Sequence, residues 1–325
     1  MSAERSSVTL VTGAMGCIGA WTLYHLVKQG THAVSFDLSD NRSRLDLLLS
    51  REEQAAIAFV RGDLTDYAQV AGAIAEHRVT HIIHLAALQV PFCRANPVMG
   101  AQVNVVGTVN VFEAARQAGI AHLAQASSIA IYGPPSAYPP GLLPHDAPPD
   151  PHTLYGVYKV ACEGIARVYW EENSLSSTTL RPYTVYGPGR DQGLTSEPTK
   201  AMLAAAAGLS FHISFGGTMQ FQYASDVALQ FIDAARQPLS GAHAFNLGSP
   251  PAAMADVVDI IRQIKPGAQI SADDKPLPFP VGFDDSELRR HFARVYETPL
   301  ADGIAQTIAT FEDALARGAL TLPEG

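Results

Sequence analysis

Two tyrosines and a lysine lie within five residues, in the stretch YGVYK that runs from Tyr155 to Lys159. Tyr155 and Lys159 are four positions apart, so on a helix their side chains share one face, whereas Tyr158 points elsewhere. A free phenol loses its proton only near pKa ~10, but a neighbouring ammonium favours the phenolate. Such a phenolate can accept a proton from an alcohol while hydride leaves the same carbon. The spacing predicts Tyr155 as a catalytic base and Tyr158 as a packing residue.

A serine that could assist this chemistry lies upstream, in the stretch SSIAIYG. Ser128 can hydrogen-bond the reacting oxygen and hold it near the phenol of Tyr155. If the strand register is shifted by one residue, Ser127 takes this role instead. The structural alternative is that Ser128 is an ordinary serine at the end of a strand. We therefore expect Ser128, Tyr155 and Lys159 to act together.

Three glycines, Gly13, Gly16 and Gly19, are spaced three residues apart between an apolar run and a helical stretch. Residues without a Cβ permit a turn so tight that backbone N–H groups and a helix N-terminus face a phosphate. The spacing is GxxGxxG rather than the commoner GxGxxG. Asp37 ends the next strand, where a carboxylate accepts hydrogen bonds from an adenosine ribose and repels a 2′-phosphate. Together these features predict NAD as the cofactor, and Arg42 is the one nearby residue that favours NADP.

These residues need a scaffold in which strands and helices alternate. Apolar runs predict strands at 7–13, 32–39, 55–64, 80–87 and 121–133, with helical stretches between them. Such alternation is typical of a parallel sheet covered on both faces. We expect an α/β fold in which residues 1–185 form a Rossmann-type, doubly wound parallel sheet. Residues 186–325 would mainly form a smaller C-terminal substrate domain, with segments near 220–247 returning to the sheet.

Composition excludes several classes of function. The formal net charge is −9 and no run of Lys or Arg occurs, which argues against nucleic acid or an anionic membrane as partner. Cys17, Cys93 and Cys162 are odd in number and far apart, as suits a reducing cytoplasm. His81 and His84 share one apolar strand and do not have metal-ligand spacing, so no metal is expected. The start MSAERSSVTL lacks the layout of a signal peptide, and no apolar run is long enough to span a membrane.

The sequence resembles the extended short-chain dehydrogenase/reductase superfamily, and its NAD-dependent epimerase/dehydratase branch in particular. The resemblance rests on motifs that follow one another through most of the first 190 residues: the glycine turn, Asp37, GDL (62–64), HLAA (84–87), NVVGT (104–108), SSIAIYG, Tyr155 with Lys159, and RP (181–182). It implies a Rossmann domain with a small substrate domain, NAD bound across the strand ends, and proton chemistry by serine, tyrosine and lysine. The lysine would also hold the nicotinamide ribose.

The resemblance also assigns residues to the cofactor. The predicted cofactor-binding residues are Gly13, Gly16, Cys17, Ile18, Gly19, Asp37, Asp63, Leu64, Leu85, Ala86, Ala87, Asn104, Tyr155, Lys159 and Pro182. Asp63 and Leu64 would border adenine, and Asn104 and Pro182 would lie on the nicotinamide side. By the same resemblance, helices near 104–118 and 155–172 would pair with those of a second copy in a homodimer.

The resemblance weakens where nucleotide-sugar epimerases hold their substrate. Those enzymes usually carry a basic residue where this chain has Met219 or Gln220, and often an asparagine where it has Thr184. Without a cation, a diphosphate loses charge-assisted hydrogen bonds. The loop after the RP motif instead offers Arg190, which can fork onto a carboxylate or sugar hydroxyls, or can pair with Asp191.

The preferred hypothesis is an NAD-dependent dehydrogenase that oxidises a secondary alcohol of a small sugar, polyol or sugar acid. The predicted substrate-binding residues are Gln89, Ser128, Tyr155, Thr184 and Arg190. The alternative is a sugar or nucleotide-sugar epimerase/dehydratase that uses tightly bound NAD and returns the hydride. A non-catalytic NAD sensor is disfavoured because Ser128, Tyr155 and Lys159 are all present.

Overall fold

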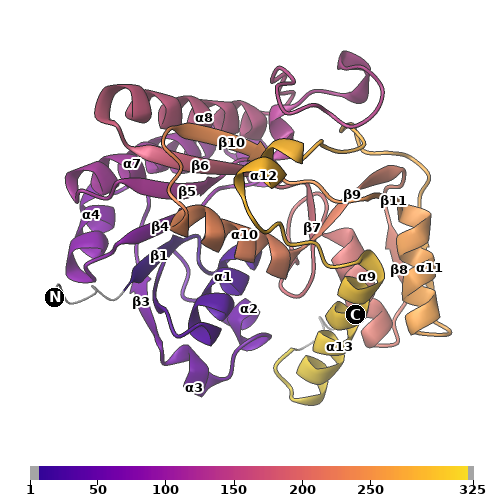
Figure 1. Cartoon of the computed structure of the whole chain (residues 1–325). Helices are drawn as coiled ribbons and strands as arrows, with labels where there is room; N and C mark the ends of the chain where they lie inside the picture. Colours follow the sequence, from indigo (N-terminus) through magenta and orange to yellow (C-terminus); the bar gives the residue numbers. More distant parts are fainter. Residues whose placement is uncertain (1–6, 321–325) are drawn as a thin grey trace.

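The computed structural model in Figure 1 describes residues 7–320. Residues 1–6, where no signal peptide is expected, and residues 321–325 lie outside the described part. The large sheet has seven parallel strands in the order β10-β6-β5-β4-β1-β2-β3. Its strands are β1 (Val8–Thr12), β2 (His32–Asp37), β3 (Ile57–Arg61), β4 (His81–His84), β5 (His122–Ala126), β6 (Ser176–Arg181) and β10 (Ala242–Asn246). The strand order reverses between β1 and β4, which confirms the doubly wound, Rossmann-type sheet and places a crevice at its carboxyl edge.

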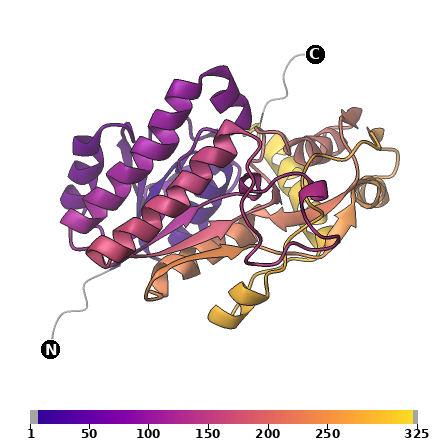
Figure 2. The same ribbon diagram turned by 90° about the horizontal axis from the view of Figure 1, so that it is seen from above.

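Helices cover both faces of this sheet. One face carries α1 (Cys17–Lys28) and α10 (Ala224–Arg236), and the other carries α4 (Tyr67–Glu76), α7 (Gly107–Gln117) and α8 (Leu154–Asn173). Figure 2 shows α7 and α8 side by side along one surface of the molecule. Strand β1 explains the two layers: Leu10 packs into the core cluster under α7, and Val11 into the cluster under α1. Both side chains are buried, so β1 reads as a continuous apolar run rather than an alternating one.

Short helical segments connect these elements. They are α2 (Ser43–Asp46), α3 (Arg51–Gln54), α5 (Val90–Ala95), α6 (Pro97–Ala101), the π-helical η1 (Gln102–Val106), and the 3₁₀ turns η2 (Ile129–Ile131) and η3 (Pro135–Ala137). Two of them, η1 and η2, follow β4 and β5 and pack against α8. The segments therefore fix where the start of α8 lies relative to the strand ends.

A smaller part of the chain stands beside the large sheet, on the right in Figure 1. It contains a three-stranded sheet, a two-stranded sheet and three helices: β7 (Thr184–Tyr186), β9 (Thr218–Tyr223) and β11 (Pro251–Ala253); β8 (Phe211–Ile213) and β12 (Ile270–Ala272); α9 (Glu197–Ala206), α11 (Met254–Ile264) and α13 (Leu300–Ala316). The short helix α12 (Ser286–His291) packs against β10 of the large sheet instead. Strand β7 straddles the expected boundary at residue 185. Within the expected returning segment, β10 joins the large sheet while β9 stays in the small one. The two-domain division stays a prediction.

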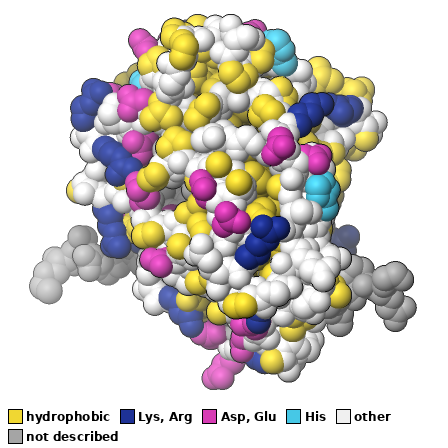
Figure 3. Space-filling view, turned by 90° about the vertical axis from the view of Figure 1, so that its right-hand side faces the viewer, with side chains coloured by type: hydrophobic (Ala, Val, Ile, Leu, Met, Phe, Trp, Pro, Cys, Tyr) yellow, Lys and Arg dark blue, Asp and Glu magenta, His cyan; other side chains and the backbone are white. Residues whose placement is uncertain are grey.

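The surface of the smaller part carries charges of both signs. Figure 3 shows Lys and Arg side chains interspersed with Asp and Glu over this face. Within residues 7–320 no helix combines the length and the apolar character needed to cross a bilayer.

Candidate active site

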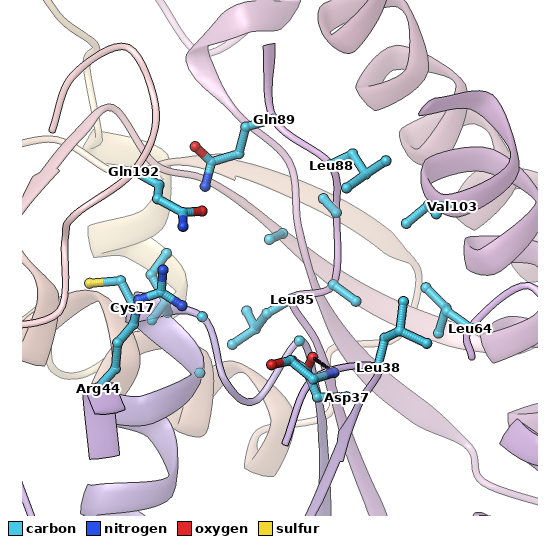
Figure 4. A pocket seen from close by; sticks show the side chains of 18 of the residues that line it. Cys17, Asp37, Leu38, Arg44, Leu64, Leu85, Leu88, Gln89, Val103 and Gln192 are labelled. Carbon is cyan, nitrogen blue, oxygen red and sulfur yellow. Dashed lines mark hydrogen bonds between the residues drawn. The ribbon is translucent and has the colours of Figure 1, made fainter. Parts of the chain in front are cut away.

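A cavity of about 650 Å³ opens at the carboxyl ends of β1, β2 and β4. Figure 4 shows it with Cys17 at one end, Leu64 and Val103 at the other and Asp37 between them, while Gln89 and Gln192 point into it from separate segments. The predicted cofactor residues in its lining are Gly13, Gly16, Cys17, Ile18, Gly19, Asp37, Asp63, Leu64, Leu85, Ala86 and Ala87. Its volume lies within the ~300–1,000 Å³ of typical small-molecule and cofactor sites.

The glycine turn forms one wall of this cavity. Gly13 has a φ of +66°, and a Cβ built on it would lie 2.6 Å from the Cα of Ala86. Only glycine accepts both that backbone conformation and that close approach. Because α1 begins immediately after Gly16, its first N–H groups face the cavity, as a phosphate site requires. The turn therefore fits the diphosphate of a dinucleotide.

Asp37 is held against this turn. Its Oδ2 accepts a hydrogen bond from the backbone N–H of Met15 at 2.9 Å, and its Oδ1 accepts one from Ser39 N–H at 2.9 Å. The carboxylate thus stands at the end of β2 in a fixed orientation, where it can accept further bonds from a ribose. The guanidinium of Arg42 stacks over the ring of Phe59, 3.5 Å from its centroid. Arg42, which leaves room for NADP in the sequence, is therefore engaged with an aromatic ring, and the carboxylate of Asp37 fits NAD.

A second cavity, of about 170 Å³, adjoins the first. Both cavities share Ile18, Leu85, Ala87, Gln89, Ala126 and Arg190 in their linings. The smaller cavity also has Ser128, Tyr155, Lys159 and Pro182 in its wall. The structure thus brings the three predicted catalytic residues together beside the cofactor cavity.

The start of α8 places Tyr155. Thr153 caps this helix, since its Oγ1 accepts a hydrogen bond from the N–H of Gly156 at 3.1 Å. A Cβ on Gly156 would lie 2.0 Å from the carbonyl oxygen of Ala130, so only glycine lets the helix approach the turn after Ser128 this closely. This contact sets Tyr155 beside Ser128 in one cavity wall.

Lys159 lies one helical turn further on and is 4% exposed. Its Nζ donates a hydrogen bond to the carbonyl oxygen of Ala126 at 2.7 Å and lies 5.7 Å from the ring centroid of Tyr155. The hydroxyl of Tyr158 donates to the carbonyl oxygen of Pro97 at 2.9 Å, away from this pair. The two tyrosines therefore face different surroundings, as the helical spacing predicts.

Both candidate serines line the smaller cavity. The Oγ of Ser128 accepts a hydrogen bond from the N–H of Ala130 at 3.2 Å and so caps η2. The Oγ of Ser127 is buried and has no hydrogen-bond partner within residues 7–320. Ser128 retains its hydroxyl hydrogen for a ligand, and Ser127 also lies within the site.

Asn104 and Thr184 lie behind the cavity walls rather than in their linings. The Oδ1 of Asn104 accepts from the N–H of Leu88 at 2.7 Å, and its Nδ2 donates to the carbonyl oxygen of Leu88 at 3.0 Å. Thr184 is fully buried and donates through Oγ1 to Met219 Sδ at 3.4 Å. Their polar groups are occupied by the protein itself, so the geometry gives them positions that support the walls instead of the direct ligand contacts expected from the sequence.

Arg190 does not pair with its neighbour Asp191. Instead, Arg44 donates to Asp191 Oδ1 through Nε at 3.1 Å and through Nη2 at 2.6 Å, and its Nη1 donates to the carbonyl oxygen of Met15 at 2.6 Å. Arg44 therefore ties the loop that carries Arg190 to the glycine turn. Sequence reasoning missed Arg44 because its partner is 147 positions away along the chain.

The proline-rich segment 275–282 forms part of the wall of the smaller cavity. The sequence did not predict this position for the segment. Phe279 lines the cavity, and the hydroxyl of Tyr183 donates to the carbonyl oxygen of Pro280 at 2.6 Å. Gln220 exchanges two hydrogen bonds with the backbone of Phe283, at 2.8 and 3.0 Å. Gln220 is one of the two positions where the resemblance leads us to expect a basic residue. Its neutral amide instead holds this segment in place.

His84 lies beneath the site and is not a ligand. Its Nδ1 is 2.7 Å from Thr12 Oγ1 and its Nε2 is 3.1 Å from Thr108 Oγ1. Burial lowers the pKa of His84 to about 3, so the ring is neutral at physiological pH. Within residues 7–320 no three His, Cys, Asp or Glu side chains are grouped so that they could hold a metal ion.

Known proteins are similar to this chain in sequence and in fold. The model of the NAD dependent epimerase/dehydratase family matches residues 9–248. A UDP-glucose 4-epimerase of Mycolicibacterium smegmatis is 33% identical over 323 residues, which cover 94% of this chain and 98% of that protein.

Two solved structures are similar over nearly their whole length. The UDP-glucose 4-epimerase of Thermus thermophilus in complex with NAD is 27% identical, with a TM-score of 0.80 over 94% of this chain and 99% of that one. An L-threonine dehydrogenase of Cupriavidus necator shares the fold at 23% identity, with a TM-score of 0.80 over 94% of this chain and 99% of its own. The glycine turn, Asp37 and the adjoining cavities agree with the cofactor that this family uses. The chain is an NAD-dependent enzyme of the epimerase/dehydratase family, within the extended short-chain dehydrogenase/reductase superfamily.

Proposed function

We propose that the enzyme is a dehydrogenase that oxidises a secondary alcohol of a small sugar, polyol or sugar acid. The observation that carries this proposal is that Ser128, Tyr155 and Lys159 line one cavity of only about 170 Å³ next to the cofactor cavity. This volume is below the ~300–1,000 Å³ of sites that hold drug-sized ligands. It therefore favours a substrate much smaller than a nucleotide sugar.

Three side chains would carry the proton chemistry. The phenol oxygen of Tyr155 takes the proton of the substrate alcohol, and Ser128 Oγ donates to the same oxygen and orients it. The ammonium of Lys159, anchored on the carbonyl oxygen of Ala126, favours negative charge on the phenol oxygen. NAD, when bound, supplies the hydride acceptor.

The buried residues Thr184, Met219 and Gln220 also favour a small substrate. The buried Thr184 and Met219 contact each other, and Gln220 is occupied by the backbone of Phe283. No cation stands at these positions to offset the charge of a substrate diphosphate.

An epimerase is the second candidate, and the relatives favour it over the dehydrogenase. The similar proteins of Mycolicibacterium smegmatis and Thermus thermophilus are UDP-glucose 4-epimerases. An epimerase would use the same three side chains and return the hydride to the opposite face of the substrate. The two candidates therefore differ in whether reduced cofactor leaves the enzyme.

The test is to mix the purified enzyme with NAD⁺ and candidate substrates and to follow absorbance of the reduced cofactor. The panel holds free sugars, polyols, sugar acids, UDP-glucose and UDP-galactose, and the Tyr155→Phe variant is the control. We expect net reduction with a small alcohol, lost in the variant. Interconversion of UDP-glucose and UDP-galactose without net reduction would establish the epimerase instead.

We further propose a homodimer formed through the surface that α6, η1, α7 and α8 share. Apolar side chains are exposed along it: Val98, Met99, Val106, Val109, Leu154, Val157 and Val168. An exposed apolar surface on adjacent helices is typical of a protein interface. Sedimentation should give a dimer for the wild type, and Val157→Glu, which puts a charge on this surface, should give a monomer. A wild-type monomer would contradict the proposal.

A further inference from the structure

Two buried polar groups in the smaller cavity lack partners. Neither Nε of Arg190 nor Oγ of Ser127 has a hydrogen-bond partner within residues 7–320. Both residues line the smaller cavity, and Ser127 is 4% exposed. Buried polar groups in folded proteins are nearly always hydrogen-bonded. Two unpaired donors in one cavity therefore indicate a ligand that brings acceptors.

The guanidinium of Arg190 also lacks a direct anionic partner. Within residues 7–320 Arg190 forms no ion pair, because Asp191 is bound by Arg44. Its hydrogen bond to Thr195 Oγ1, at 3.3 Å, goes to a neutral group. Burial lowers the pKa of the Arg190 guanidinium, yet an arginine stays charged at neutral pH. A desolvated cation without an anionic partner is costly, so an anionic ligand would relieve that cost.

We propose that Arg190, Ser127 and Thr195 form a carboxylate-binding subsite, so that the substrate is a small hydroxy acid rather than a neutral sugar or polyol. This inference rests on the proposed function in one respect, namely that the substrate alcohol meets Tyr155 in the same cavity. A guanidinium binds a carboxylate through two parallel hydrogen bonds, and a serine hydroxyl can add a third. Ser127 directly precedes Ser128, so the carboxylate lies close to the carbon that reacts.

The cofactor diphosphate is the other source of anionic oxygens, since Arg190 lines the larger cavity as well. The glycine turn and the start of α1 already supply N–H donors for that diphosphate. Arg190 also shares the wall of the smaller cavity with Tyr155, on the reacting side. The geometry therefore favours the substrate as the anionic partner of Arg190. If the partner is the substrate, loss of Arg190 weakens binding of the acid; if it is the cofactor diphosphate, loss of Arg190 weakens binding of NAD⁺.

The test measures binding without turnover. The Tyr155→Phe enzyme, loaded with NAD⁺, is titrated by calorimetry with D-gluconate and D-glucuronate, and with sorbitol and D-glucose as their neutral counterparts. We expect at least one acid to bind about tenfold or more tightly than its counterpart. Adding Arg190→Gln should weaken that acid about 30-fold or more, as removal of one partner of a buried charge pair does. Arg190→Lys should weaken it less, and the affinity for NAD⁺ should stay within about twofold.

Controls separate binding from folding. Arg317→Gln removes an exposed arginine that pairs with Asp313 on α13 and should leave acid binding unchanged. Melting temperatures of all variants show whether they are folded, and Arg190→Lys keeps the charge if Arg190→Gln is unstable.

Other outcomes overturn the proposal. Loss of NAD⁺ affinity with intact acid binding would assign Arg190 to the cofactor diphosphate. Equal binding of acids and neutral counterparts, or no binding of any acid, would exclude the carboxylate subsite. The dehydrogenase proposal can fail independently of the subsite. If acids bind through Arg190 but the wild-type enzyme produces no reduced cofactor with them, the subsite is supported and the dehydrogenase proposal is wrong.

Discussion

The two adjoining cavities differ in whether the polar groups that line them have hydrogen-bond partners in the protein. In the larger cavity both carboxylate oxygens of Asp37 accept backbone hydrogen bonds, and Asp63 Oδ1 accepts two from Thr65. In the smaller cavity Ser127 Oγ has no partner within the described residues, and neither has Nε of Arg190, which lies where the two cavities meet. The cofactor side is thus organised before any ligand arrives, whereas the substrate side is completed by its ligand. Selectivity for the substrate should therefore lie in the smaller cavity.

The largest expected effect comes from Tyr155→Phe, which alters only the smaller cavity. Loss of the general base should lower turnover about 100-fold to 10,000-fold, while NAD⁺ affinity stays within about twofold. The matched control is Tyr158→Phe, which loses only the hydrogen bond to Pro97 and should keep its activity. Steady-state kinetics and NAD⁺ titration measure both quantities. Near-normal turnover in Tyr155→Phe would mean that another group is the base.

Asp37→Ser should act on the larger cavity alone. Removing the carboxylate takes away charge-assisted bonds to the ribose and the repulsion of a 2′-phosphate. We expect NAD⁺ affinity to fall about tenfold or more and the preference over NADP⁺ to shrink. Fluorescence titration with both cofactors measures the change. If the variant still discriminated against NADP⁺ as strongly as the wild type, Asp37 would not be the selective group.

Gly156→Ala should disturb the contact that sets Tyr155 beside Ser128. The new Cβ would lie 2.0 Å from the carbonyl oxygen of Ala130, and such overpacking destabilises by ~1–3 kcal/mol. Gly164→Ala, on the same helix with nothing within 4 Å of its Cβ, should instead stabilise by ~0.5–1 kcal/mol. Denaturant unfolding compares the two. Equal effects at both positions would show that the close approach is not what requires Gly156.

A last prediction concerns the pH dependence of stability and His84, whose buried ring lies between Thr12 and Thr108. Its pKa is lowered from 6.5 to about 3 in the folded state, so the unfolded chain takes up a proton first as the pH falls. Its contribution to the free energy of unfolding is complete above pH ~6.5 and is lost progressively as the pH falls from there towards 3. The slope of unfolding free energy against pH between 6.5 and 4 should therefore be shallower in His84→Gln. An unchanged slope in His84→Gln would contradict the lowered pKa of His84.

The larger cavity could be predicted from the sequence because its parts are local. Gly13, Asp37 and Leu85 each follow an apolar strand, and the ends of parallel strands meet at one edge of the sheet. The helical spacing of Tyr155 and Lys159 likewise needed only local geometry. What the sequence could not show was the direction of Asn104, whose amide turns to the backbone of Leu88.

The smaller cavity depends on contacts between distant segments. Its lining joins Ser128, Tyr155, Arg190 and Phe279, which no periodic pattern links. Arg190 has no ion pair with Asp191 because Asp191 is bound by Arg44, which is 147 positions away along the chain. Such pairings follow from tertiary packing and carry no signal in residue spacing. The substrate side was therefore predictable only in its catalytic residues.

The most direct test of the two-cavity account is a crystal structure of Tyr155→Phe with NAD⁺ and the acid that binds most tightly. The account predicts the cofactor in the larger cavity with its diphosphate on the glycine turn. It also predicts the carboxylate within hydrogen-bond distance of Arg190 and Ser127, and the alcohol oxygen beside Ser128. An acid bound outside the smaller cavity, or a carboxylate turned away from Arg190, would contradict it.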